Sequence, residues 1–213
     1  MTAVVLAAAG GVVPELAAAI NENRAWLSEI DGAIGDGDHG INMSKGFSQA
    51  AAALGPATEG LAASFTLLGD TLLGGIGGSM GPLYGTFFLE MAASLAGAAT
   101  LDAAGCARML HAGLNGVTEL GGAKPGDKSM LDALVPAIAA FDEALAGGAE
   151  FAACLDAMAA AAAEGRDATR GMVARIGRAA RLGERSRGVL DAGAASCCLI
   201  LQTLAEGLKQ RMA

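Results

Sequence analysis

Three carboxylates lie close together in the segment 31–42, at Asp31, Asp36 and Asp38. Carboxylates at this spacing repel one another unless a cation joins them, and hard oxygen ligands of this kind suit Mg²⁺ or Ca²⁺. A calcium-binding EF-hand loop starting at Asp36 is excluded, because Ile41 stands where glycine is required and Phe47 where the bidentate glutamate belongs. The segment therefore predicts a Mg²⁺ site, with a solvated acidic turn as the alternative.

Two glycine-rich segments could bring backbone N–H groups close to phosphates. The segment 74–82 ends at Pro82, a residue suited to the first turn of a helix, and its alternative role is a hinge between close-packed helices. The glycine pattern at 35–40 matches G-x-G-x-x-G, but no strand precedes it, which excludes a dinucleotide-binding motif. Only the segment 74–82 is therefore retained as a candidate phosphate cradle.

Two further segments carry cations. The segment 121–130 resembles a P-loop but misses it by one residue, because Asp127 separates Gly126 from Lys128. Its lysines, Lys124 and Lys128, are candidate phosphate or partner contacts, with solvated surface lysines as the alternative. Arginines are concentrated between residues 178 and 187, and the planar guanidinium group pairs with two phosphate oxygens at once. These arginines are Arg178, Arg181, Arg185 and Arg187.

The elements that must position these segments are helices. Apolar residues recur at helical spacing, and the sequence contains no alternating run typical of a strand. The spacing predicts an all-α fold of eight helices, with the seventh broken near Gly165 as one option. The predicted helices span 14–30, 42–54, 59–73, 82–96, 102–120, 130–146, 150 to about 180, and 193–212.

Short connections between these helices predict an antiparallel up-and-down bundle. In such an array every loop from an odd to an even helix lies at the same end. All four unusual segments are odd-to-even loops, so we expect them to converge on one site at one end of the bundle.

Composition limits the remaining choices. The 213 residues are 53% hydrophobic and are interpreted as a single domain, 1–213. The net charge of −8 argues against nucleic-acid binding. Glycines and a proline interrupt the longest uncharged run, 71–89, so no membrane span is predicted and the chain is expected to be soluble and cytoplasmic. The four cysteines lack metal-binding spacing and are predicted to be reduced core thiols.

Taken together, the four loops closely resemble those of the nucleotide-binding L subunit (DhaL) of dihydroxyacetone kinases and the homologous domain of the ATP-dependent enzymes, over nearly the whole chain. The residues that carry the resemblance are 35–42 (GDGDHGIN), 77–85 (GGSMGPLYG), 121–132 (GGAKPGDKSMLD), 183–188 (GERSRG) and 191–193 (DAG). The resemblance implies an eight-helix barrel with Mg-ADP or Mg-ATP at one end. It also implies that Asp31, Asp36 and Asp38 hold two Mg²⁺ ions.

The resemblance further implies a set of nucleotide contacts, with Arg178 as the catalytic residue that stabilises the transferred phosphoryl group. The contacts are His39, Gly40, Ile41, Asn42, Ser79, Met80, Gly121, Met130, Arg178, Asp191, Ala192 and Gly193. Met80 stands where relatives often carry serine, and Ala192 stands within what is often Asp-Pro-Gly. A hydroxyl contact to phosphate at position 80 is therefore not expected.

In this family the sugar is held by a separate K subunit or domain, so the chain is expected to be half of a dihydroxyacetone or related ketose kinase. Two phosphate donors are compatible with the sequence: ATP that exchanges, or a phosphohistidine-carrying phosphotransferase-system subunit that recharges bound ADP. The sequence is also compatible with a homodimer. The alternative function is a nucleotide-sensing regulatory or lipid-binding-associated module on the same fold.

Overall fold

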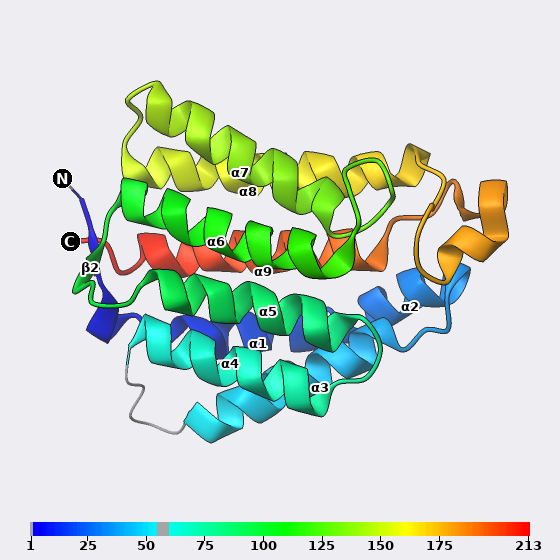
Figure 1. Cartoon of the computed structure of the whole chain (residues 1–213), viewed down its shortest axis with the longest axis horizontal. Helices are drawn as coiled ribbons and strands as arrows, with labels where there is room; N and C mark the ends of the chain where they lie inside the picture. Colours follow the sequence, from blue (N-terminus) through cyan, green and yellow to red (C-terminus); the bar gives the residue numbers. More distant parts are fainter. Residues whose placement is uncertain (1, 55–59) are drawn as a thin grey trace.

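The computed structural model describes residues 2–54 and 60–213, and this part of the chain contains nine α-helices (Figure 1). The helices are α1 (Val12–Glu22), α2 (Arg24–Ile34), α3 (His39–Leu54), α4 (Leu61–Gly75), α5 (Met80–Ser94), α6 (Ala103–Gly121), α7 (Leu131–Ala146), α8 (Phe151–Ala168) and α9 (Ala192–Lys209). Short 3-10 turns, η1 (Leu6–Ala8), η2 (Thr169–Gly171) and η3 (Ala179–Ser186), add to them. The predicted all-α class is confirmed.

Neighbouring helices contact one another in the order α1, α3, α4, α5, α6, α7, α8 and α9, and α9 also contacts α1. The helix α2 projects from one end of this arrangement, where it contacts α3 and η3 (Figure 1). Because successive helices reverse direction, α3, α5, α7 and α9 all begin at the end that carries α2.

The predicted helix 14–30 is in fact two helices, which is why nine are observed where eight were predicted. The break falls at Asn23, whose backbone leaves the helical region (φ −99°, ψ 7°). Its side-chain amide donates to the carbonyl oxygen of Ala19 at 2.9 Å. A side-chain amide that bonds to the preceding turn competes with helix propagation, and this ends α1.

The predicted helix 150–180 is also wrong in its second half, because α8 ends at Ala168. It does not break at Gly165. A Cβ added there would lie 2.2 Å from the carbonyl oxygen of Asp132, so glycine is what allows α8 to approach α7 closely. The hydroxyl of Thr169 donates to the carbonyl oxygen of Arg166 at 2.6 Å at the end of α8. The other predicted helices agree to within three residues, except that Glu59, the predicted start of 59–73, lies outside the described residues.

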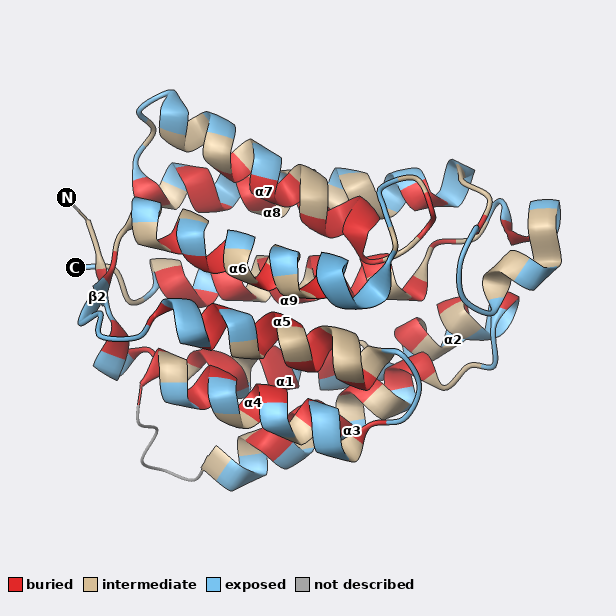
Figure 2. Cartoon of the chain, viewed as in Figure 1, coloured by how far each residue is buried: buried red, intermediate tan, exposed pale blue. Residues whose placement is uncertain are grey.

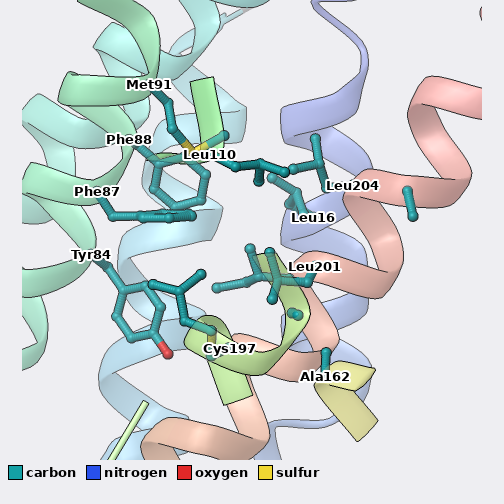
Figure 3. Close-up of a cluster of buried hydrophobic side chains, with 14 of the residues drawn as sticks. Leu16, Tyr84, Phe87, Phe88, Met91, Leu110, Ala162, Cys197, Leu201 and Leu204 are labelled. Carbon is teal, nitrogen blue, oxygen red and sulfur yellow. The ribbon is translucent and has the colours of Figure 1, made fainter. Parts of the chain in front are cut away.

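The core runs along the middle of the bundle, and each helix turns its buried face towards it (Figure 2). Four phenylalanines form a continuous aromatic cluster, with Phe88 at 5.3–5.9 Å, centroid to centroid, from Phe47, Phe65 and Phe87. Figure 3 shows Phe87 and Phe88 above Tyr84, facing Leu201 and Leu204 of α9. The four cysteines are buried and free, as predicted.

The two chain ends meet at the other end of the bundle (Figure 1). The two-residue strands β1 (Val4–Val5) and β2 (Thr100–Leu101) pair antiparallel, and the amide of Ala213 donates to the carbonyl oxygen of Ala3 at 3.1 Å. Arg211 pairs with both carboxylate oxygens of Glu15, at 2.6 and 3.2 Å. Within the described ranges, no helix is long and apolar enough to cross a membrane.

Candidate functional site

All four of the loops singled out in the sequence line one cavity of about 570 Å³, at the end of the bundle that carries α2. This size is within the usual range for small-molecule sites. The acidic loop contributes Asp31, Ile34, Gly35, Asp36, Asp38 and His39, and the glycine loop Gly78, Ser79 and Met80. The third loop contributes Gly121, Ala123, Lys128, Ser129 and Met130, and the fourth Ile176, Gly177, Arg178, Ala179, Asp191, Ala192 and Gly193.

Four helix N-termini converge on this cavity. The first residues of α3, α5, α7 and α9 all line it, namely His39, Met80, Leu131 and Ala192. The unpaired N–H groups and the positive end of the helix dipole favour an anion at such a position. Asp191 uses one of these groups, since its Oδ2 accepts from the amide of Ala194 at 2.7 Å, and it caps α9. The helix starts therefore favour an anionic group at their own part of the cavity.

Three of the residues predicted to contact nucleotide do not line the cavity. Gly40 packs against α2, where a Cβ would lie 2.0 Å from the carbonyl oxygen of Arg24. Ile41 is 48% exposed and lies at a separate small groove beside α2, and Asn42 is half-buried in the first turn of α3. Of the segment 39–42, only His39 lines the cavity. The other predicted contacts and the three aspartates all do.

The carboxylates of Asp31, Asp36 and Asp38 come together as the sequence predicts. Each offers an oxygen atom, and these atoms lie within 4.8 Å of one another. Gly37 makes the tight turn between the last two with a positive φ of 77°. The Oδ2 of Asp31 is buried and accepts no hydrogen bond. A buried, unpaired carboxylate oxygen facing two other carboxylates is a ligand set that fits a hard cation such as Mg²⁺.

We expect the substitution Asp31→Asn to weaken metal binding without lowering the stability of the metal-free fold. It removes a charge from a crowded site, so the midpoint of thermal unfolding in EDTA should stay the same or rise. A ligand at a hundred times its dissociation constant stabilises the native chain by about 2.7 kcal/mol, or about 5–10 °C for a chain of this size. The wild type should show this rise with Mg²⁺ and ADP, and Asp31→Asn should lose most of it. A variant that keeps the full rise would show that Asp31 is not a ligand.

Arg178 lines the cavity beside the acidic loop. Its guanidinium group forms an ion pair with Asp36, and its side chain is still 60% exposed. Arg178 belongs to the segment 172–190, which follows α8 and η2 and passes over this end of the bundle to reach α9 (Figure 1). A cation is thus held beside the carboxylates, where a phosphoryl group bound through a metal ion would lie.

A buried hydrogen-bond chain beneath the cavity was not predicted from the sequence. The ring Nε2 of His39 lies 2.8 Å from the hydroxyl oxygen of Ser196, which lies 2.7 Å from that of Tyr84. The hydroxyl of Tyr84 also donates to the carbonyl oxygen of Gly193 at 3.0 Å. This chain joins α3, α5 and α9. Burial lowers the pKa of His39 to about 4, so the ring is neutral at pH 7 and is positioned as a neutral hydrogen-bonding group.

Two charged residues of the cavity, Asp191 and Lys128, are affected by burial. Burial raises the pKa of Asp191 to about 7, and the neighbouring Asp132 adds to the effect. Lys128 is only 2% exposed, so the expectation that it is a solvated lysine or a partner contact is wrong. Lys124, Arg185 and Arg187 are exposed, as expected for surface cations.

Comparison with known proteins identifies relatives along most of the chain. The chain is 37% identical over 207 residues to the ADP-binding subunit DhaL of PEP-dependent dihydroxyacetone kinase 2 from Listeria innocua, covering 94% of each chain. It is 38% identical over 187 residues to the corresponding PEP-dependent subunit from Escherichia coli, covering 87% of this chain and 89% of that one.

The solved dihydroxyacetone kinase of C. freundii superposes with a TM-score of 0.71 at 28% identity over 93% of this chain. A second structure of that kinase, in complex with AMP-PNP and Mg²⁺, gives the same TM-score. The present chain spans about a third of those kinase chains, at 34% and 33%. Residues 33–206 match the model of the DAK2 domain. With this match and these relatives, the chain belongs to the DAK2 domain family, together with the DhaL subunits of dihydroxyacetone kinases.

Proposed function

We propose that this chain is the nucleotide-binding, phosphoryl-transferring subunit of a kinase for dihydroxyacetone or a related ketose. The observation that carries the proposal is the convergence of three carboxylates, four helix N-termini and Arg178 on one cavity. The names of the relatives, ADP-binding subunits of dihydroxyacetone kinases, support it. So does the solved relative in complex with AMP-PNP and Mg²⁺.

In this proposal Asp31, Asp36 and Asp38 hold two Mg²⁺ ions. When bound, Mg²⁺ neutralises phosphate charge and orients the nucleotide for in-line transfer. The backbone at Ser79, Met80, Ala192 and Gly193 offers N–H groups at the starts of α5 and α9. Met80 supplies no hydroxyl, so a phosphate contact at position 80 comes from its backbone.

Arg178 is the proposed catalytic residue. Phosphoryl transfer depends chiefly on positioning and on neutralising charge that develops on the transferred group, and a guanidinium group does both. Its pairing with Asp36 supports this role, because a phosphate held through Mg²⁺ by the same carboxylates would lie close to the guanidinium group. No cavity residue of this chain is assigned as a general base.

The sugar substrate is proposed to lie on a K subunit that docks at the cavity end. Four of the large hydrophobic side chains that are exposed lie at this end, at Ile41, Leu73, Leu120 and Ile176. Exposed cations at Lys124, Arg185 and Arg187 lie in the loops that precede α7 and α9 at the same end. An apolar surface with a charged rim is typical of a protein–protein interface. The phosphate donor is either ATP or a phosphohistidine protein of the phosphotransferase system that recharges bound ADP.

The proposal is tested by giving the purified chain Mg²⁺, a phosphate donor and dihydroxyacetone, with and without a matching K subunit. The chain alone should form little or no dihydroxyacetone phosphate, because the positioning of the two reactants is lost when the sugar diffuses freely. Addition of the K subunit should restore turnover. Robust phosphorylation by the chain alone, free of contaminating kinase, would contradict the division of labour between two subunits. Mass spectrometry of the natively purified chain, showing retained ADP, would favour the recharging mode over exchange of ATP.

A further inference from the structure

The segment 172–190, which carries Arg178, has little apolar packing to hold it in place. Of its residues only Ala174, Ser186 and Leu190 are buried. It contains no α-helix, and η3 within it is interrupted at Gly183, whose φ is 54°. A segment with so few buried contacts depends on polar interactions for its position over the cavity.

The ammonium group of Lys128 supplies such interactions. Its Nζ donates to the carbonyl oxygens of Met172 at 3.2 Å, Ser186 at 2.5 Å and Val189 at 2.7 Å. These acceptors lie at the beginning and at the end of the segment, so one buried cation joins its two ends. Arg178 lies on the stretch between them. Hydrogen bonds to a charged donor are stronger than those between neutral groups, and more so when shielded from water.

The backbone around Lys128 adds to this attachment. The amide of Arg175 donates to the carbonyl oxygen of Asp127 at 3.0 Å, and within the segment the amide of Ala174 donates to the hydroxyl of Ser186 at 2.9 Å. Lys128 itself has a φ of 65°, and in the described part of the chain it is the one non-glycine residue with a positive φ. Glycine would adopt this conformation without strain. At Lys128 the contacts of the side chain offset the unfavourable energy of the backbone conformation.

Lys128 lines the cavity, but its chemistry argues against direct binding of phosphate. An ammonium group has three N–H donors, and the three carbonyl oxygens use all of them. Among the described residues no carboxylate forms an ion pair with it. The three carbonyl oxygens therefore occupy every donor of the ammonium group, which leaves none for a phosphate.

We infer that Lys128 is a positioning residue, which clamps the two ends of the segment 172–190 and so holds Arg178 beside the acidic cluster. This inference rests on the proposed function, because it assigns Lys128 a part in phosphoryl transfer through Arg178. Lys128→Met is the variant to test, since it keeps an unbranched side chain and removes the charge and all three donors. Lys209→Met is the matched control, because it makes the same chemical change at the opposite end of the bundle, in the last turn of α9.

The first measurement is hydrogen–deuterium exchange of the full chain without nucleotide, read peptide by peptide. The amide of Gly188 donates to the carbonyl oxygen of Arg170 at 2.8 Å. In Lys128→Met, the peptides that contain Ala174 and Gly188 should exchange at least about tenfold faster, as expected when charged hydrogen bonds are lost. The helices α6 to α9 and the Lys209→Met control should exchange as in the wild type. Unchanged exchange within 172–190 would overturn the inference. So would an equal increase throughout α6 to α9, which would mark Lys128 as a residue of general stability.

The second measurement is a double-mutant cycle in the kinase reconstituted with a K subunit. Lys128→Met should lower kcat about tenfold or more and change the KM for Mg-nucleotide little, but in an Arg178→Ala background it should lower kcat less than about twofold. If the kcat of the double variant falls by the product of the two single-variant losses, Lys128 does not act through Arg178. If no K subunit gives turnover with the wild-type chain, the proposed function fails, whereas the exchange measurement still decides whether Lys128 clamps the segment.

Discussion

Arg178→Ala is expected to lower kcat of the reconstituted kinase by about a hundredfold to a thousandfold, the usual effect of removing a group that stabilises developing charge. The side chain is mostly exposed and, among the described residues, forms an ion pair with Asp36 alone, so its removal should leave the fold and its thermal unfolding unchanged. Steady-state kinetics with saturating K subunit would give kcat, and circular dichroism would report the fold.

Arg181→Ala is the control for this prediction. Arg181 is exposed in the same segment, three residues further on, but does not line the cavity. It should keep nearly wild-type turnover. If Arg178→Ala also keeps it, or loses it only together with the helical signal, then Arg178 has no direct part in phosphoryl transfer.

The second large effect is expected at Asp38. Asp38→Asn removes one ligand charge from the cluster, and each charged contact of this kind contributes about 1.5–3 kcal/mol, so affinity for Mg-ADP should fall by about ten- to a hundredfold. Within residues 2–54 and 60–213, Asp38 pairs with no cation, in contrast to Asp36, so its substitution disturbs the metal site without releasing Arg178. Isothermal titration calorimetry would measure the affinity.

The same titration repeated in EDTA isolates the contribution of the metal. Without Mg²⁺, the wild type and Asp38→Asn should bind ADP equally weakly, and Asp70→Asn, which changes an exposed carboxylate on α4, should match the wild type under both conditions. If Asp38→Asn binds Mg-ADP with wild-type affinity, Asp38 is not a metal ligand. If the variant loses as much ADP affinity in EDTA as it does with Mg²⁺, Asp38 acts on the nucleotide directly and not through the metal.

The position of the site was predictable because all four loops run from an odd to an even predicted helix and so lie at one end of the bundle. The helices α1 and α2 show why this prediction did not depend on the exact number of helices. The sequence predicts one helix at 14–30 where two exist, but both run towards the same end of the bundle, so the acidic loop still lies there (Figure 1). The break itself was not predictable from apolar spacing, because the apolar positions continue past Asn23. It depends on a single side-chain hydrogen bond, which the pattern does not record.

The residues that support the site were harder to predict than those that line it. Asp31, Asp36 and Asp38 are close in sequence, so their spacing alone indicates a cation. Ser196 reaches His39 across 157 positions, and Lys128 reaches Val189 across 61. No local pattern distinguishes these two from an ordinary helix serine or a surface lysine, because their partners exist only once the four loops have met.

The meeting of the two chain ends limits how this domain can be joined to another. Both ends lie at the far end of α9 from the cavity, and its 18 residues span about 27 Å at the rise of an α-helix. A sugar-binding domain fused to either end starts at about this distance from the nucleotide, so its tether and its own length must together span it; a tether alone would need at least about eight extended residues. If tether and domain together fall short, the two reactants stay apart in one polypeptide, and phosphoryl transfer has to occur between separate molecules.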